Sequence, residues 1–186
     1  MTLFQRWRAE RQLQRKADQY ASALLEEPAD DDVAWLAANA TRGDTDHARW
    51  ELRYARRALG LLVAQRDALD DRTGSFVAHA ITDAFERDAN IDRDRRELAE
   101  RQFNARLSAY RDALGARLAD SSGRLGQTLL AFSGGSFREV DANVRRAGDT
   151  LSAYEKDANA SLREIFGTAA LPEHIPPSAL AGGNAT

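Results

Sequence analysis

The sequence predicts an all-α protein: a single helical-bundle domain with four long helices, short connecting helices and an extended C-terminal tail. Three observations predict this class. Pro28 is the only proline before Pro172, so a long central stretch lacks the strongest helix breaker. Apolar residues recur at steps of three and four along several segments, as on one face of a helix. No segment combines strand-like alternation with β-branched and aromatic enrichment, so no sheet is expected.

Two helices are expected in the N-terminal quarter. The first should cover 3–27, because residues 2–5 have the form of a capping box. After Pro28, the three successive aspartates at 30–32 favour the start of a short helix, which Gly43 ends.

The third helix is expected over 46–69, and apolar side chains cover more than half of its circumference. A helix of this kind must be contacted from more than one side, so we place it at the centre of the bundle. Its narrow polar stripe consists of Arg49, Arg53, Arg56 and Arg57, continued by Asp67 and Asp71.

A corner is expected at 70–75, where Gly74 lies among residues that favour helix caps. A fourth, shorter helix should follow, ending near Asn90. Asp92 is a suitable cap for a long fifth helix. The apolar stripe of that helix is Ala99, Phe103, Leu107, Tyr110, Leu114 and Leu118.

The C-terminal part should contain two more helices and the tail. Residues 121–123 are expected to break the chain before a short apolar helix that ends at 134–135. A capping box at 136–139 then opens the last helix, and Gly167 is suited to follow its end. Its nearly heptad stripe is Val140, Val144, Ala147, Leu151, Tyr154, Ala158, Leu162 and Ile165. The bundle therefore spans 1–167 and the proline-containing tail 168–186. The core is expected to depend on Trp50, Leu59, Leu62, Phe103, Leu107, Leu151 and Tyr154.

The residues that carry common chemistries are missing or wrongly spaced. The chain has no cysteine, and none of its three histidines follows a glutamate at the spacing of a di-iron site. The calcium-like segment 88–94 fails because Arg93 and Ala99 occupy two decisive positions of the loop. No glycine-rich phosphate loop is present. We therefore expect no enzyme activity, no cofactor and no metal site.

Charge and hydropathy restrict the partners and the location. The 26 Lys and Arg residues and 29 Asp and Glu residues give a net charge of −3, and Asp67 and Asp71 interrupt the arginine stripe, so no nucleic-acid partner is expected. The longest strongly apolar run, 58–64, is too short to cross a membrane. The N-terminus lacks the apolar core of a secretory signal. The cytoplasm is expected, including the cytoplasmic face of the inner membrane.

The candidate binding residues of the first helix lie on one side of a helical wheel. They are Phe4, Trp7, Arg8, Arg11 and Arg15. The apolar residues nearer the end of the helix point about 100° away from this side. A single apolar stripe rotates too slowly around a helix to explain so large an angle. Aromatic rings beside arginines suit an anionic membrane surface or an acidic protein groove. In the alternative, Phe4 and Trp7 cap the end of the bundle and the arginines are solvated.

The tail contributes three more candidate residues: Leu171, Ile175 and Leu180. Apolar side chains in a proline-stiffened segment suit an arm that docks on a partner. Docking of the tail on its own bundle fits the same residues equally well.

The segment RWELRYARRALGLLVAQRDALDDR, residues 49–72, is similar to small helical proteins of high-GC bacteria. The whole chain resembles the membrane-extrinsic helical polypeptides that brace a type 2 photosynthetic reaction centre within its antenna ring. This resemblance implies a structural role without bound pigment, and it carries over no functional residue.

The leading hypothesis is therefore a non-enzymatic structural subunit, peripheral to the membrane, that stabilises a larger complex. Its partners would be proteins, in particular a membrane complex such as a photosynthetic reaction centre with its light-harvesting antenna, with peripheral membrane contact. The alternative is a soluble helical bundle that binds a small apolar ligand as a sensor or carrier.

Overall fold

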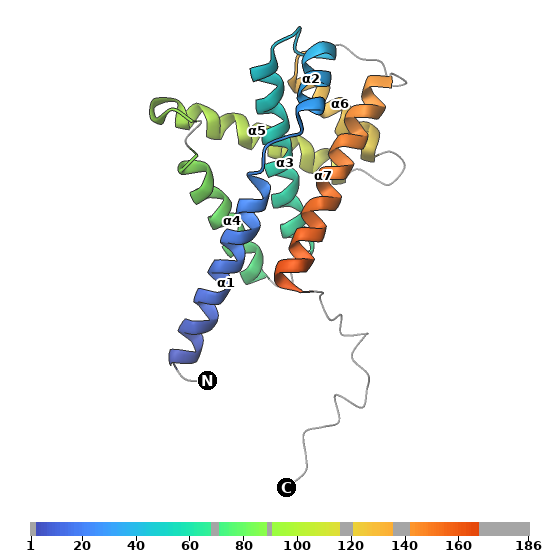
Figure 1. Ribbon diagram of the computed structural model, residues 1–186. Helices are drawn as coiled ribbons and strands as arrows, with labels where there is room; N and C mark the ends of the chain where they lie inside the picture. Colours follow the sequence, from blue (N-terminus) through green and yellow to red (C-terminus); the bar gives the residue numbers. More distant parts are fainter. Residues whose placement is uncertain (1–2, 68–70, 89–90, 116–120, 136–141, 168–186) are drawn as a thin grey trace, which may run out of the picture.

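The computed structural model describes residues 3–67, 71–88, 91–115, 121–135 and 142–167, and all regular structure within them is helical (Figure 1). This confirms the all-α class, whereas a bundle of four long helices is not confirmed. The elements are α1 (Leu3–Leu24), α2 (Asp30–Asn39), α3 (Thr45–Asp67), α4 (Asp71–Glu86), the 3₁₀ helix η1 (Arg93–Arg95), α5 (Arg96–Gly115), α6 (Ser121–Phe132) and α7 (Ala142–Phe166).

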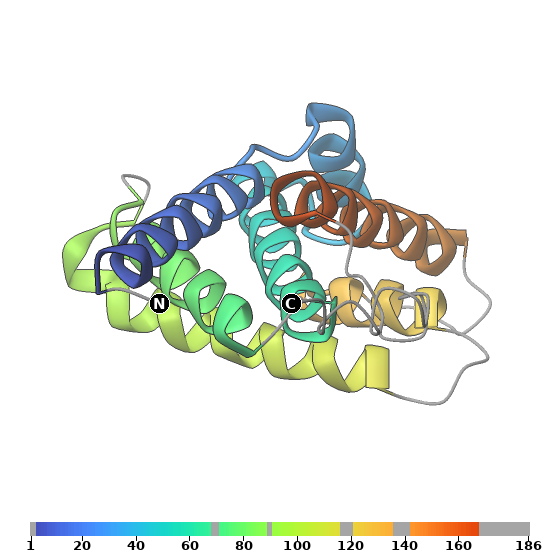
Figure 2. The same ribbon diagram turned by 90° about the horizontal axis from the view of Figure 1, so that it is seen from below.

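Helix α3 is central, as its wide apolar arc predicts. It packs against α2, α4, α5 and α7. Seen from below, α3 lies between α1 with α4 on one side and α7 with α6 on the other (Figure 2). Its side chains Leu52, Leu59 and Val63 are at most 1 % exposed.

The core consists of two large clusters of buried apolar side chains and a small third cluster, formed by Tyr54, Ile91 and Ala99. The upper cluster, in the orientation of Figure 1, joins α2, α3, α5, α6 and α7 around Leu36, Leu59 and Leu151. The lower cluster joins α1, α3, α4 and α7 around Tyr20 and Val77. The side chain of Leu107 on α5 packs against both clusters. Helix α4 thus contributes to the core along α1, and is more than a short connection between longer helices.

Most of the expected core residues are buried in this arrangement. Leu59, Leu62, Leu151 and Tyr154 are buried. Phe103 and Leu107 are partly buried and pack against the large clusters, whereas Trp50 is partly buried against the small third cluster.

Three expected boundaries are wrong. The first helix ends at Leu24, three residues before the expected end at 27. Helix α4 begins at Asp71, so Gly74 lies inside the helix and not at a corner. Packing of α4 on α1 outweighs the roughly 1 kcal/mol that a glycine costs within a helix. Similarly, α6 begins at Ser121, so residues 121–123 are helical, and Ser122 approaches the backbone of α7 at Gly148.

Several expected helix ends are confirmed. The carboxylate of Asp92 accepts a hydrogen bond from the backbone N–H of Asp94 (3.1 Å) at the start of η1, which leads into α5. Gly167 follows α7 with a φ of 90°, in the left-handed region that glycine adopts without steric cost. The expected capping box at 136–139 lies outside the described residues.

Candidate functional site

Helix α1 has an inner half that packs on the bundle. Its side chains Ala17, Tyr20, Ala21 and Leu24 are buried in the lower cluster. The Tyr20 hydroxyl also donates a hydrogen bond to the carbonyl oxygen of Gly60 on α3 (2.9 Å). Burial raises the pKa of Tyr20, so this donor keeps its proton at neutral pH. The inner half therefore fixes the direction in which the rest of α1 leaves the bundle.

The outer part of α1 extends beyond the bundle (Figure 1). We call residues 3–12 the N-terminal overhang; all of its side chains from 4 to 12 are exposed. An ion pair between Glu10 and Arg72 marks where the first turn of α4 lies beside α1. Phe4 is 76 % exposed and Trp7 is 49 % exposed. Neither ring belongs to a core cluster, which speaks against their capping the bundle, whereas the neighbouring arginines are exposed, as the alternative also expects.

Arginine side chains accompany the two exposed rings. The Arg11 guanidinium lies over the Trp7 ring, 4.0 Å from its centroid. Arg8 and Arg15 are exposed and form no ion pair with the described residues. Residues 3–16 contain five cationic side chains and one carboxylate, a net charge of +4, whereas the whole chain carries −3.

The structure therefore places all five candidate residues of α1 at exposed positions, four of them in the overhang and Arg15 one turn beyond Arg11. This part of α1 is both aromatic and basic. This surface can bind an anionic, partly apolar partner. The other three candidates, Leu171, Ile175 and Leu180, lie outside the described residues.

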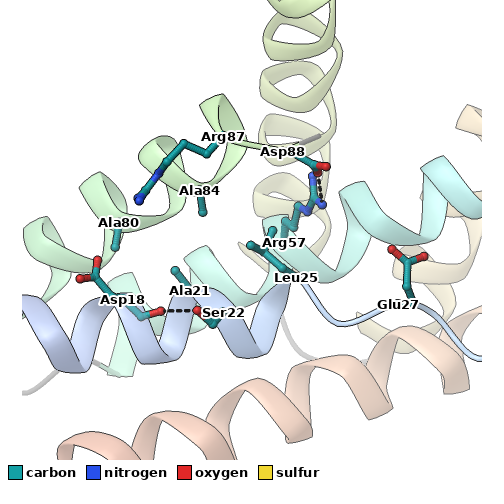
Figure 3. A pocket seen from close by; sticks show the side chains of 10 residues that line it. All are labelled: Asp18, Ala21, Ser22, Leu25, Glu27, Arg57, Ala80, Ala84, Arg87 and Asp88. Atoms are coloured by element: carbon teal, nitrogen blue, oxygen red, sulfur yellow. Dashed lines mark hydrogen bonds and ion pairs between the residues drawn. The ribbon is translucent and has the colours of Figure 1, made fainter. Parts of the chain in front are cut away.

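A separate pocket of about 390 Å³ opens between α1, α3 and α4 (Figure 3). At its inner end the Arg57 guanidinium donates a hydrogen bond to the Asp88 carboxylate over 2.6 Å. The two side chains are only 4 % and 7 % exposed. Arg57, a member of the narrow polar stripe of α3, is therefore buried. The chain beyond α4 brings Asp88 over α3, which no local sequence pattern around Arg57 reveals.

This pocket has no arrangement for nucleophilic catalysis among its described lining residues. The Ser22 hydroxyl donates to the backbone oxygen of Asp18 (2.8 Å), and no histidine lies beside it to accept its proton. Arg87, at the pocket mouth, donates from Nε to the carbonyl oxygen of Asp83 in its own helix (2.9 Å). The Arg57–Asp88 pair thus joins α3 to the end of α4 as a structural contact.

The other arginines of the α3 stripe bind carboxylates in the connection between α1 and α2 and at the start of α2. Arg53 forms a forked pair with Glu27, with its shortest N···O distance at 2.7 Å. Arg49 pairs with Asp30 over 3.1 Å, and Arg56 pairs with a neighbouring glutamate over 2.8 Å. The positive charges of these arginines are therefore balanced by carboxylates of the same chain.

A second buried ion pair joins α3 to α5. Glu51 is 2 % exposed and accepts a hydrogen bond from Arg106 Nε over 2.8 Å. The Arg106 guanidinium lies against the rings of Tyr54 and Phe132, with centroid distances of 5.1 and 4.5 Å. The sequence pattern did not predict this pair. The available signal was a single carboxylate, Glu51, inside the apolar part of a central helix.

In the described part of the chain, no group of three or more His, Asp or Glu side chains is placed to hold a metal ion. None of the described helices combines the length and the apolar character that crossing a membrane requires. Comparisons of the chain with protein-family models, with curated proteins and with solved structures find no significant match.

Proposed function

We propose that the protein is a non-enzymatic structural subunit that attaches peripherally to a membrane-bound complex through its N-terminal overhang. One observation supports this proposal above all others: Phe4 and Trp7 stand exposed on a helical segment that is otherwise basic. Exposed apolar rings with polar surroundings mark interaction surfaces. The inner half of α1 holds the overhang in place, so the bundle acts as its scaffold.

The expected free energy of binding favours reversible attachment. Burying each aromatic ring contributes about 1.5–3 kcal/mol, and each arginine near an anionic surface contributes roughly 1 kcal/mol. Because Trp7 is already half-buried in the free protein, two rings and three arginines offer at most about 6–9 kcal/mol. The loss of overall freedom on association must be subtracted from this value. The expected attachment is weak, and salt reduces its electrostatic part.

Sedimentation with lipid vesicles tests the apolar part of this surface. We expect the protein to bind phosphatidylglycerol vesicles more tightly than phosphatidylcholine vesicles, and high salt to release it. Replacing Phe4 and Trp7 together by alanine should abolish binding. The matched control is Leu98→Ala on α5, which removes another exposed apolar side chain, 47 % exposed, and should leave binding unchanged.

A charge reversal tests the electrostatic part. Arg8→Glu combined with Arg11→Glu should weaken binding more strongly than Arg101→Glu, which reverses an arginine that is 68 % exposed on α5. Equal effects of overhang and control variants would contradict the proposal. So would retention of the protein on native membranes after washing with high salt or carbonate.

Native membranes then identify the complex. Retention on native membranes without binding to protein-free vesicles would identify a protein of the complex as the docking partner. The proteins that co-purify with the chain also test the resemblance to reaction-centre accessory polypeptides. Recovery of the chain alone, with neither vesicles nor native membranes binding it, would refute the structural role.

A further inference from the structure

A second cavity, of about 200 Å³, lies where the two core clusters meet. It is bounded by α3, α4 and α5, and it involves no residue of the N-terminal overhang. Its lining consists of Leu61, Ala78, Ile81, Thr82, Glu100, Phe103, Asn104 and Leu107. The inner walls are apolar, and the polar side chains among these residues are exposed.

The cavity has a clear structural origin. Helices α4 and α5 diverge from the corner that connects them, and α3 crosses between them (Figure 1). At this level α4 contributes the small side chain of Ala78. Phe103 and Leu107 on α5 remain partly exposed although they pack against the core. The apolar surface that lines the cavity is therefore incompletely buried by the protein itself.

The rim of the cavity determines what could enter. The Thr82 hydroxyl donates to the carbonyl oxygen of Ala78 in its own helix (3.1 Å). Glu100 and Asn104 form no hydrogen bond or ion pair with the described residues. Glu100 is the one ionisable side chain among the described lining residues. The mouth thus offers a carboxylate and an amide, and it favours a ligand with a positive charge or hydrogen-bond donors.

We infer that this cavity binds a small aromatic amine. A single aromatic ring fits the available space, since a cavity of about 150 Å³ holds benzene. The ring packs among Leu61, Ile81 and Phe103, and the ammonium group reaches the Glu100 carboxylate at the mouth. The ligand completes the packing between α4 and α5.

Three one-ring probes separate the apolar contribution from the charge contribution. They are benzylamine, benzyl alcohol and benzoate, titrated into the ¹⁵N-labelled full-length protein and followed by NMR. Benzylamine should shift the amide signals of the lining residues on α3, α4 and α5. It should bind about tenfold more tightly than benzoate, because unlike charges attract and like charges repel across a short distance at the protein surface. Benzyl alcohol should fall between them.

Two variants with matched controls test the site. Ala78→Leu fills the cavity and should abolish benzylamine binding, whereas Ala105→Leu adds the same side chain at an exposed position of α5 and should not. Glu100→Gln should remove the preference for benzylamine over benzyl alcohol, whereas Glu97→Gln, on an exposed part of the same helix, should keep it.

The titrations and the variants can each overturn a part of this proposal. Absence of shifts at the lining residues, or unchanged binding to Ala78→Leu, would overturn the site. Equal binding of benzoate and benzylamine would overturn the role of Glu100, and the exposed Glu100→Gln variant tests that role without disturbing the core. Because the cavity and the overhang share no residue, vesicle binding is measured separately, and failure of either proposal leaves the other standing.

Discussion

The two halves of α1 belong to the same uninterrupted helix, yet they differ in almost every physical respect. In the inner half, Tyr20 and Leu24 are at most 4 % exposed and pack on α3, α4 and α7. In the overhang, the largest apolar side chains are exposed, and the only carboxylate is paired with Arg72. The inner half contributes to folding, whereas the overhang is free to contact another molecule.

This difference shows how a helix can carry a binding surface at little cost to the fold. Adding residues to an existing helix is far easier than nucleating a new one. The overhang therefore needs little packing of its own. Local contacts such as the stacking of Arg11 on Trp7 are sufficient to support it. Substitutions in the two halves should accordingly have opposite consequences for stability and for binding.

The largest effect is expected for Tyr20→Ala. This change removes a fully buried ring and the hydrogen bond to Gly60, and should cost about 3–5 kcal/mol of unfolding free energy. Urea denaturation followed by circular dichroism measures it. A cost below about 1 kcal/mol would show that the inner half is not part of the core. Tyr20→Phe, which removes only the hydroxyl, should cost about 1 kcal/mol.

Asp88→Ala tests the contact between α3 and the chain that follows α4. It leaves the buried Arg57 guanidinium without the carboxylate that it binds, and should cost about 3 kcal/mol. The control is Glu97→Ala, which breaks an exposed pair with Arg101 and should cost at most about 0.5 kcal/mol. Similar thermal shifts for the two variants would contradict the structural role of the buried pair.

Gly60→Ala probes how closely α1 approaches α3. A methyl group at position 60 would collide with the buried Leu24 side chain, so this side chain or the helix that carries it must shift. We expect a loss of about 1–2 kcal/mol, although alanine is roughly 1 kcal/mol better than glycine within a helix. Gly115→Ala, where nothing lies within 4 Å, should instead be neutral or stabilising. The difference between the two melting temperatures is the measurement.

The pH dependence of stability tests the lower end of α3, near Tyr20. A hydrogen bond from Arg66 lowers the pKa of Asp67, which also accepts a hydrogen bond from Asn159 on α7 (2.7 Å). A lowered folded-state pKa stabilises the fold above the unfolded-state value of about 3.9, and this contribution is lost as the pH falls through the folded-state value. Since the Asp67 side chain is still 30 % exposed, Asp67→Asn should cost at most about 1 kcal/mol at neutral pH. The cost should vanish in acid, as urea denaturation at both pH values would show.

The smallest effect on stability is expected for Trp7→Ala. Its ring lies outside both core clusters, so unfolding free energy should change by less than about 0.5 kcal/mol. The same variant should weaken vesicle binding. A fall of several degrees in melting temperature would mean that Trp7 packs on the core of the protein, and the division of α1 into two functional halves would then be wrong.

The sequence pattern predicted the features that are set within a single helix, such as which of its sides faces the core. The stripe through Leu151 and Tyr154 faces the core because a near-heptad repeat keeps one side of α7 turned inward. On a helical wheel, Trp7 and Tyr20 point in different directions, because the direction of a side chain around the helix axis is set by its position in the sequence. This difference likewise predicted that the two halves of α1 have different surroundings. These inferences needed no knowledge of the neighbouring helices.

Features that depend on several helices could not be predicted in this way. Arg53 and Arg57 are one turn apart, yet one binds an exposed glutamate and the other is buried against Asp88. Their difference depends on where the chain beyond α4 crosses α3. The cavity beside Ala78 also exists only because α4 and α5 diverge. No local sequence pattern predicts that divergence.

The uneven charge distribution also affects how fast the protein finds its partner. Residues 3–16 carry +4 and the whole chain −3, so the remaining residues together carry −7. In the field of an anionic surface, such a molecule turns its overhang forward before contact, because the rest of the protein is repelled. Encounters are then productive in a larger fraction of collisions than random orientation allows. The association rate should therefore fall with ionic strength more steeply than the dissociation rate rises.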